Sequence, residues 1–214
     1  MAVTKTVETP RILEAVAAGA ALLGENRVQE LERKRGELQG RLPEAGVPCE
    51  VHLIGHLQGN KAAKAVALAD MIQSVDSVRV AREISAACQK QGKAMPVLLE
   101  VNIGRDEAKF GFLPEQAEEA LGEIARLPGI LVRGLMTVPP LDASPARTQN
   151  FFSKMRKLYV DIRAKKMDNS MGGPDAPALD ILSMGMSQDF ELAVAEGSTL
   201  VRVGSAIFGE RDPR

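Results

Sequence analysis

The sequence predicts an α/β protein that consists of a single (β/α)8 barrel of the TIM type, and three observations lead to this prediction. Eight short apolar runs recur along the chain, and patterns typical of amphipathic helices separate them. Strands that alternate with helices form parallel sheets, and eight such units favour a closed barrel over an open sheet. The length of 214 residues suits one α/β domain, so we expect residues 1–214 to form a single barrel.

The apolar runs themselves are the predicted strands. The first two are short, and we interpret them as strands because they keep the rhythm of the other six. The first begins at residue 2, which leaves two alternatives: a barrel with a minimal first edge, or a natural start further upstream. In chain order, the predicted strands are Ala2–Val3, Ala21–Leu23, Val51–Ile54, Met71–Val75, Val97–Val101, Ile130–Met136, Leu179–Leu182 and Leu200–Val203.

Helical patterns fill the segments between these runs. Thr9 is the predicted N-cap of the first helix and Pro10 its first helical residue, a position that proline favours. Residues 167–177 follow no regular pattern. We interpret them as a surface loop rather than a domain boundary, because too few residues follow to form a second core. The other predicted helices cover residues 26–40, 60–69, 77–91, 114–126, 145–166 and 187–196, with a short helical stretch after Ser205.

Composition and charge argue against several classes of function. The 27 lysines and arginines nearly balance the 28 aspartates and glutamates, which disfavours a basic nucleic-acid surface and a polybasic membrane anchor. With no Trp, one Tyr and six Phe, the chain has few aromatic side chains for stacking on bases. No apolar run approaches the roughly 20 residues of a membrane-spanning helix, and no signal-peptide pattern opens the chain. We therefore expect a soluble, cytoplasmic protein.

Cysteines and histidines give no sign of a disulfide framework or a metal site. The two cysteines, Cys49 and Cys88, lack the spacing of metal ligands and are too few for a framework. The two histidines, His52 and His56, have the spacing of paired ligands on a helix, but their apolar neighbours favour a strand and a turn. We expect no metal ion.

Polar residues gather where the predicted strands end, which is the face of a (β/α)8 barrel that carries its chemistry. Lys5 follows the first strand, Asn26 the second and His56 the third. Asn26 and Ser77 also suit a role as helix caps. Lys5 is not a capping residue. It is either a solvated charge or an amine at the barrel mouth that forms a Schiff base with an aldehyde.

The loops after the seventh and eighth strands predict an anion site. Gly204-Ser205 follows the eighth strand, and Ser183-Met-Gly-Met-Ser187 follows the seventh. Backbone N–H groups and hydroxyls at such turns cradle phosphates, and these two loops are the usual phosphate site of a (β/α)8 barrel. The alternative is a pair of ordinary glycine turns, with Ser187 as a helix N-cap.

Two charged features have a structural and a functional interpretation. Arg202 lies inside the eighth strand, where an arginine needs a partner. It either pairs with Glu100 of the fifth strand or points its guanidinium at a ligand in the barrel mouth. Residues 30–37 are interpreted as a helix face of mixed charge, on which Glu30 and Lys34 have the (i, i+4) spacing of an ion pair.

The most specific signal comes from motifs spread in order over nearly the whole chain. They are Ala2-Val-Thr-Lys5-Thr, Gly24-Glu-Asn-Arg-Val-Gln-Glu30, His52-Leu-Ile-Gly-His-Leu-Gln-Gly-Asn-Lys61, Val101-Asn-Ile-Gly104, Lys109-Phe-Gly-Phe112, Arg133-Gly-Leu-Met-Thr137, Leu182-Ser-Met-Gly-Met-Ser187 and Val201-Arg-Val-Gly-Ser-Ala-Ile-Phe-Gly209. Together they resemble the YggS/PROSC family of pyridoxal 5′-phosphate (PLP) homeostasis proteins. That family is a single barrel like the N-terminal domain of alanine racemase. Its members usually carry an N-terminal helix, which we expect this chain to lack.

The resemblance implies PLP as the cofactor and assigns roles position by position. Lys5 matches the lysine that holds the cofactor as an internal aldimine, and Arg202 matches the arginine that faces the pyridine nitrogen. The residues that match the phosphate-binding loops are Ser187, Gly204 and Ser205. The residues in motifs that line the pocket are Asn26, His56, Met136 and Met184.

The function that the resemblance implies is the buffering and delivery of PLP in intracellular vitamin B6 homeostasis, with apo forms of PLP-dependent enzymes as recipients. The alternative is a PLP-dependent amino-acid racemase or lyase. A two-base racemase needs an acid or base on each face of the cofactor, and in alanine racemases a Tyr from a second domain is one of them. Here Tyr159, the single Tyr, lies on a predicted helix far from the barrel mouth.

We therefore expect a monomeric PLP-binding protein without catalytic residues. A third interpretation is a phosphosugar enzyme, which would use the same phosphate loops. That interpretation lacks a pair of acid and base residues at the barrel mouth, where Asp76 stands nearly alone.

Overall fold

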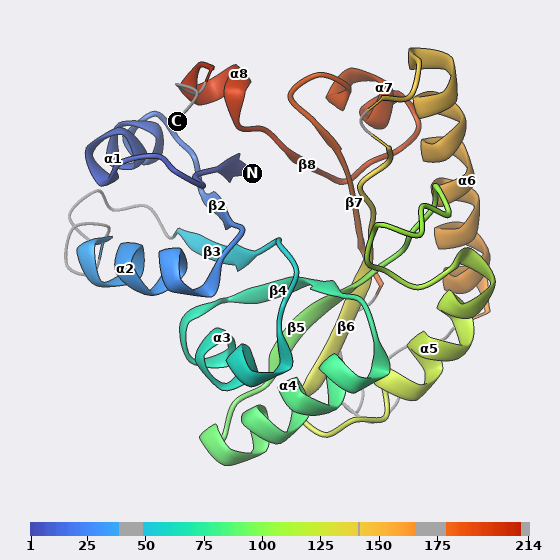
Figure 1. The fold of residues 1–214 in the computed structure, drawn as a ribbon, viewed down its shortest axis with the longest axis horizontal. Coiled ribbons are helices and arrows are strands. Elements are labelled where there is room, and N and C mark those ends of the chain that lie inside the picture. The colour runs from blue at the N-terminus through green and yellow to red at the C-terminus, as the bar shows by residue number, and fades with distance from the viewer. Residues whose placement is uncertain (39–48, 141, 166–178, 211–214) are drawn as a thin grey trace.

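The fold is a parallel β-barrel with helices arranged around its outside (Figure 1). The computed structural model describes residues 1–38, 49–140, 142–165 and 179–210. In this part of the chain, eight strands follow one another in the order β1 to β8, and each neighbouring pair is parallel. A parallel bridge between Ala2 and Val203 links the last strand to the first, with the Val3 N–H donating to the Val203 carbonyl at 2.8 Å. The predicted (β/α)8 barrel is confirmed.

Each predicted strand has a counterpart in the barrel, and the largest shift in position is at β7. This strand begins two residues later than predicted and continues to Met186, so Ser183 and Met184 belong to the strand rather than to the loop after it. A buried serine is tolerated at this position because its hydroxyl has polar partners inside the barrel. The strands are β1 Ala2–Val3, β2 Leu22–Glu25, β3 Glu50–Leu53, β4 Met71–Val75, β5 Met95–Glu100, β6 Ile130–Met136, β7 Ile181–Met186 and β8 Leu200–Arg202.

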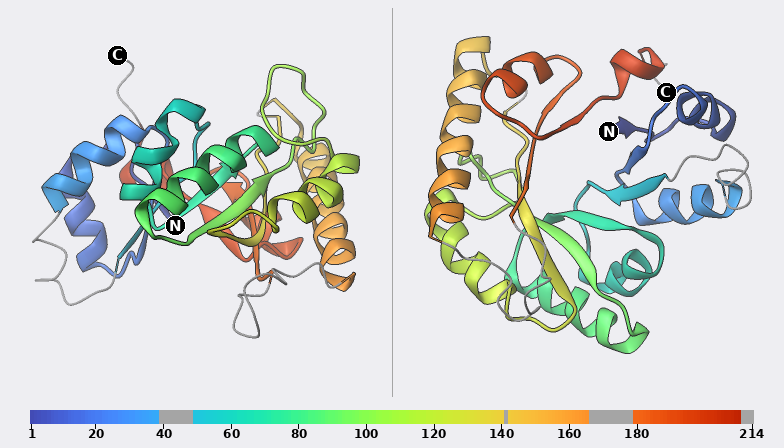
Figure 2. Two further views of the ribbon diagram at one scale, coloured as in Figure 1. Left: turned by 90° about the horizontal axis from the view of Figure 1, so that it is seen from below. Right: turned by 180° about the vertical axis from the view of Figure 1, so that it is seen from behind.

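The helices lie close to their predicted positions and surround the strands in every view (Figure 2). Thr9 is an exception at the residue level: it is the first residue of α1, and Glu8 is the N-cap. The Thr9 hydroxyl donates to Glu37 instead of capping the helix. The helices are α1 Thr9–Ala17, α2 Val28–Leu38, α3 Ala62–Leu68, α4 Val78–Gln91, α5 Ala117–Ile124, α6 Pro145–Ala164, α7 Phe190–Ala195 and α8 Ser205–Phe208, with one-turn 3₁₀ helices η2 Gly59–Lys61 and η3 Pro114–Gln116.

Three predicted details fall outside the described residues: the last two residues of the helix at 26–40, residue 166, and the loop at 167–177. One predicted cap is confirmed, because the Ser77 hydroxyl accepts the Val80 N–H at the start of α4.

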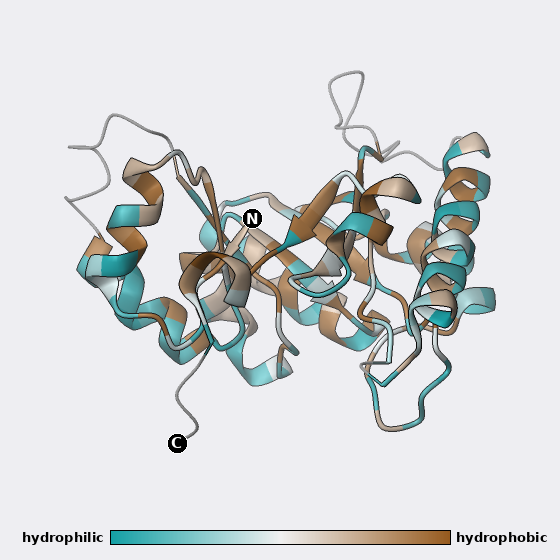
Figure 3. Ribbon diagram, turned by 90° about the horizontal axis from the view of Figure 1, so that it is seen from above, coloured by the Kyte–Doolittle hydropathy of each residue, from teal (hydrophilic) through white to brown (hydrophobic). Residues whose placement is uncertain are grey.

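The main hydrophobic core lies between the barrel and its helices. Residues such as Ile72 on β4, Ile84 on α4 and Val97 on β5 have no exposed surface. Burial of one such side chain contributes about 1.5–3 kcal/mol, so this layer is what holds the helices against the strands. Hydrophobic residues accordingly colour the strands and one side of many helices (Figure 3). The core leaves the carboxyl ends of the strands free to carry polar groups.

Candidate functional site

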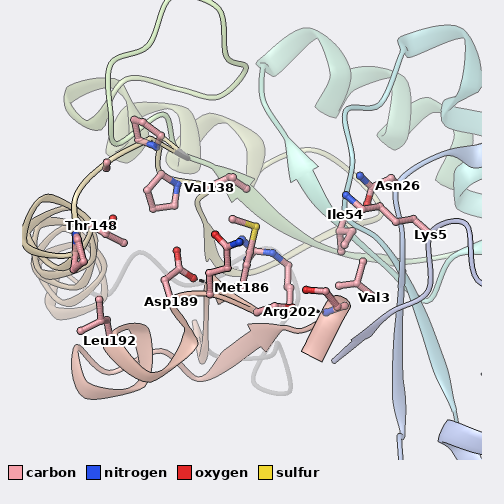
Figure 4. A pocket seen from close by; sticks show the side chains of 18 residues that line it. Val3, Lys5, Asn26, Ile54, Val138, Thr148, Met186, Asp189, Leu192 and Arg202 are labelled. Carbon is pink, nitrogen blue, oxygen red and sulfur yellow. Dashed lines mark hydrogen bonds between the residues drawn. The ribbon is translucent and has the colours of Figure 1, made fainter. Parts of the chain in front are cut away.

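A cavity of about 680 Å³ opens at the carboxyl ends of the strands, on the side where β1 meets β8 (Figure 4). Residues from both ends of the chain line it, because the first and last strands are neighbours in the barrel. The predicted site residues that line this cavity are Lys5, Asn26, Ser187, Arg202, Gly204 and Ser205. One side of the cavity thus brings together an amine, an amide, hydroxyls and a guanidinium.

Lys5 lies in a turn two residues beyond β1, and its side chain is half-buried at the cavity wall. Asn26 lies next to it at the end of β2, and Figure 4 shows the two side chains on the same side of the cavity. The loop after β3 packs directly against Asn26: a Cβ added at Gly55 would lie 2.9 Å from the Asn26 Cα. Only glycine allows this approach, which holds the Asn26 backbone at the cavity wall.

The loops after β7 and β8 are joined by the Ser187 hydroxyl. Its Oγ accepts the backbone N–H of Gly204 at 3.0 Å and that of Ala206 at 3.4 Å. Ser187 is therefore not the N-cap of α7, a position that Asp189 holds. The hydroxyls of Ser187 and Ser205 lie beside the Gly204 and Ala206 N–H groups, whose acceptor here is Ser187 Oγ. A phosphate dianion that replaced this oxygen as acceptor would find hydroxyl and N–H donors together, which is the chemistry that it needs.

Arg202 points from β8 into the cavity and is almost completely buried. Its Nη1 donates to the Ser183 hydroxyl at 2.6 Å, and its Nη2 donates to the Thr137 carbonyl at 2.8 Å. Burial lowers the pKa of Arg202 to about 10, against the opposing fields of Glu100 and Asp189. The guanidinium remains charged at neutral pH and can only donate hydrogen bonds.

The alternative pairing of Arg202 with Glu100 does not occur as an ion pair among the described residues. Glu100 acts on Arg202 only through its field, and burial, together with the field of Asp76, raises the pKa of Glu100 to about 7. The physical reason is that Arg202 already has two neutral acceptors in hydrogen-bond contact.

A chain of hydrogen bonds continues from Arg202 through the inside of the barrel. The Ser183 hydroxyl donates to Gln73 Oε1 at 2.8 Å, and Gln73 Nε2 lies 2.9 Å from His52 Nδ1. His52 Nε2 in turn lies 3.0 Å from a Glu50 carboxylate oxygen. Burial lowers the pKa of His52, so its neutral ring accepts at Nδ1 and donates at Nε2. This series of hydrogen bonds holds the Arg202 guanidinium in place from inside the barrel.

Three predicted pocket residues do not line this cavity. His56 pairs its Nδ1 with Asp76 at 2.7 Å and stacks on the exposed ring of Phe110. Met136 lies in a small apolar cluster with two other buried side chains. Met184 is fully buried in the main core. Their roles toward a cofactor remain predictions.

The position of Met184 has a local cause. The register of β7 shifts between Ser183 and Met186, and Gly185 has a φ of +94° that side chains rarely adopt. The shift breaks the alternation of the strand, so Met186 rather than Met184 lines the cavity.

Sequence reasoning missed the far wall of the cavity. Figure 4 shows Val138, Thr148 and Leu192 there, on the side away from Lys5. The pair Pro139-Pro140, directly after a predicted strand, is a signal that could have indicated this wall. The missed lining residues are Val3, Ile54, Val138, Pro139, Pro140, Ala143, Pro145, Thr148, Met186, Gln188, Asp189 and Leu192.

The described ranges contain neither a candidate metal cluster nor a helix that could span a membrane. No group of three or more His, Cys, Asp or Glu side chains could hold a metal ion there. Over the same residues, no helix is long and apolar enough to cross a membrane. Cys49 and Cys88 are both free thiols.

Comparison with known proteins gives consistent matches over almost the whole chain. A family model described as alanine racemase, N-terminal domain, matches residues 1–212. A relative from Aquifex aeolicus, named pyridoxal phosphate homeostasis protein, is 38% identical over 208 residues, covering 97% of this chain and 85% of that protein. A relative of the same name from Pseudomonas aeruginosa is 34% identical over 212 residues, covering 99% of this chain and 84% of that protein.

Solved structures agree. The structure of PipY from Synechococcus elongatus with PLP bound has a TM-score of 0.85 and 37% identity, covering 98% of this chain and 91% of that chain. An alanine racemase from Corynebacterium glutamicum has a TM-score of 0.67 at 19% identity, covering 100% of this chain and 56% of that chain, which is a likeness of fold.

Proposed function

This chain belongs to the family of pyridoxal phosphate homeostasis proteins, within the alanine racemase N-terminal domain fold, and from that premise we propose that it binds PLP in order to buffer and deliver it. The observation that carries the proposal is the lining of one cavity by Lys5, by the Ser187 and Gly204-Ser205 loops, and by Arg202. These residues offer an amine, an anion cradle and a charged donor within one enclosure.

The donor set fits PLP group by group. When bound, PLP supplies an aldehyde that condenses with a primary amine and releases water. Lys5 is the amine of the cavity wall, and it must be uncharged at Nζ to form that bond. A phosphate would replace the Ser187 oxygen as acceptor of the Gly204 and Ala206 N–H groups, with the Ser187 and Ser205 hydroxyls as further donors. Arg202 supplies a permanent positive charge between them.

The charge of Arg202 favours a carrier over an enzyme. An arginine has no proton acceptor and remains charged even with its lowered pKa, so it keeps a neighbouring ring nitrogen unprotonated. An unprotonated pyridine is a weaker electron sink than one paired with a carboxylate. Tyr159 offers no second base, because its buried hydroxyl donates to the Leu179 carbonyl at 2.9 Å within the core. We propose that the protein is not an enzyme and that it acts as a monomer in the cytoplasm, with apo enzymes as recipients.

The assignment of Lys5 is tested by reductive trapping. Purified protein is incubated with PLP, reduced with borohydride and mapped by peptide mass spectrometry. We expect one covalent adduct, on Lys5, and its complete loss in a Lys5→Ala variant. Lys109→Ala is the matched control, since Lys109 donates to the Pro139 carbonyl near the same cavity without lining it. Equal labelling of the Lys5→Ala protein would refute the assignment.

The carrier role is tested with amino acids. Holo protein incubated with L-alanine should leave its chirality unchanged, while PLP should transfer to an added apo enzyme. Conversion of L-alanine to the D form at a rate that Lys5→Ala abolishes would establish a racemase instead.

A further inference from the structure

Directly behind Lys5, away from the cavity, lies a buried cluster of charges that the proposed function does not use. It consists of Glu25 at the end of β2 and of Glu30 and Lys34 on α2. Lys34 Nζ donates to Glu25 at 2.7 Å, to Glu30 at 2.8 Å and to the backbone carbonyl of Thr4. These contacts occupy all three donors of the ammonium group. Lys34 is therefore a buried member of the mixed-charge helix face predicted from the sequence, and its pairing with Glu30 is confirmed.

The cluster holds the peptide groups on both sides of Lys5. The Thr4 carbonyl, which accepts from Lys34, belongs to the peptide that precedes the Lys5 Cα. The Thr6 N–H belongs to the peptide that follows it, and it donates to Glu30 Oε1 at 2.5 Å. The peptides on both sides of Lys5 thus have contacts that converge on a single ion pair, Glu30 with Lys34, in addition to the bond of 2.9 Å from the Val7 N–H to the Thr4 carbonyl that closes the turn.

The turn that this cluster holds is strained. Thr6 has a φ of +63°, in the left-handed region that a β-branched residue rarely adopts. Such a conformation persists only where the surrounding contacts over-determine it. Two contacts hold it here: the Val7 N–H donates to the Thr4 carbonyl at 2.9 Å and closes the turn, and Glu30, itself held by Lys34, accepts the Thr6 N–H.

Stability alone gives a poor account of the cluster. Buried ion pairs contribute little net stability compared with apolar residues of the same volume, because desolvation opposes their attraction. Burial raises the pKa of Glu25, and Glu25 Oε2 is buried without a hydrogen-bond partner. The arrangement therefore costs folding free energy through desolvation, and its contacts are made to the turn that carries Lys5.

We propose that Glu30 and Lys34 are positioning residues for Lys5: they fix the backbone on both sides of it and so aim its amine into the cavity. The proposal rests on the proposed function, in which Lys5 bonds covalently to PLP. It assigns to α2, a helix that contributes no residue to the cavity lining, control over the geometry of the amine.

The test separates covalent attachment from binding of the rest of the ligand. Glu30→Ala removes the acceptor of the Thr6 N–H and half of the ion pair. Two quantities are measured for the full-length variant. The first is the rate at which PLP becomes attached to Lys5, followed by borohydride quenching and mass spectrometry. The second is the affinity for pyridoxine 5′-phosphate. The latter has an alcohol in place of the aldehyde and reports only on the phosphate and ring contacts.

We expect Glu30→Ala to slow attachment by roughly tenfold or more, because a reacting group misplaced by about 1 Å loses much of its rate. Its affinity for pyridoxine 5′-phosphate should stay at the wild-type level. Glu32→Ala is the matched control on the same helix. Glu32 pairs with Lys64 at 2.9 Å on the exposed surface, so its loss should change neither quantity.

Restoring the turn without Glu30 is the second arm. In the double variant Glu30→Ala, Thr6→Gly, glycine adopts the positive φ without strain, and attachment should recover toward the wild-type rate. Recovery supports the proposal, and a rate as low as that of Glu30→Ala alone overturns it.

Two further outcomes overturn the proposal: attachment in Glu30→Ala equal to that in Glu32→Ala, or a parallel loss of pyridoxine 5′-phosphate affinity, which would indicate general loosening of the barrel. Failure of the proposed function is distinguishable from both, since wild-type protein would then bind neither PLP nor pyridoxine 5′-phosphate.

Discussion

Lys34 and Arg202 are both buried cations, but Lys34 lies behind the Lys5 turn and Arg202 lines the cavity, and their charged surroundings differ. Lys34 is 1% exposed and is paired with two carboxylates. Arg202 is 4% exposed, and its hydrogen-bond partners are a hydroxyl and a backbone carbonyl, neither of them charged. The carboxylates of Glu100 and Asp189 reach Arg202 only through their fields.

The difference indicates what each charge is for. The charge of Lys34 is cancelled locally by Glu25 and Glu30, so it can organise the backbone but cannot attract a ligand. The charge of Arg202 is only partly cancelled, so it raises the electrostatic potential of the cavity and favours an anionic occupant. One cation belongs to the scaffold of the Lys5 turn, and the other belongs to the binding surface.

The largest effect on stability should come from removing Lys34, the counter-ion of Glu25 and Glu30. Lys34→Met leaves the buried Glu25 and the partly buried Glu30 without their counter-ion, and we expect a loss of roughly 3–5 kcal/mol in the free energy of unfolding. Urea denaturation of the cofactor-free protein measures it. Lys64→Met, which breaks an exposed pair with Glu32, should change stability by about 0.5 kcal/mol or less. Equal losses in both variants would contradict the importance of burial.

A smaller effect on stability should follow from the ionisation of Glu100, whose carboxylate acts on Arg202 through its field. Burial, with the field of Asp76, raises the pKa of Glu100 from 4.5 to about 7. The folded protein therefore holds this proton through a pH range in which the unfolded chain releases it. The resulting stability is present in full below pH 4.5 and is lost as the pH rises through about 7.

Glu100→Gln tests this dependence, because glutamine carries no proton to release. Compared with wild type, the variant should gain up to about 3 kcal/mol of stability as the pH rises through this window. Urea denaturation series below and above the window measure the difference. If the two proteins lose stability in parallel, another group is responsible for the titration.

The smallest effect should come from the neutral partner of Arg202. Ser183→Ala removes the acceptor of Arg202 Nη1 and interrupts the chain to Gln73, and we expect a loss of about 2 kcal/mol. Ser85→Ala is the control, since its buried hydroxyl donates to the Pro128 carbonyl and touches no charge. Its loss should be about 1 kcal/mol. A smaller loss in Ser183→Ala than in Ser85→Ala would show that Thr137 alone satisfies Arg202.

The sequence predicted the order of strands and helices because hydrophobic periodicity and helix signals are local. It also predicted that Lys5 and the Gly204-Ser205 loop belong to one site, because a barrel brings its strand ends together. It could not predict the burial of Lys34, since the surrounding charges on α2 are typical of a solvated face. The burial of Lys34 depends on its ion pair with Glu25, which lies on β2 and not on α2.

The sequence also could not predict that Met186, rather than Met184, lines the cavity. It depends on a register shift in β7 that involves the pairing with β8. The alternative pairing of Arg202 with Glu100 does not form for a similar reason. Neutral acceptors on β7 and after β6 lie closer to the guanidinium than any carboxylate of the described residues.

The bridge between β1 and β8 also orders events in time. Lys5 is synthesised about two hundred residues before Arg202 and Gly204. Contacts between such distant segments form late in folding. A chain in which β8 has not yet been made has the amine but no cradle, so ligand capture across this seam requires a barrel that has closed.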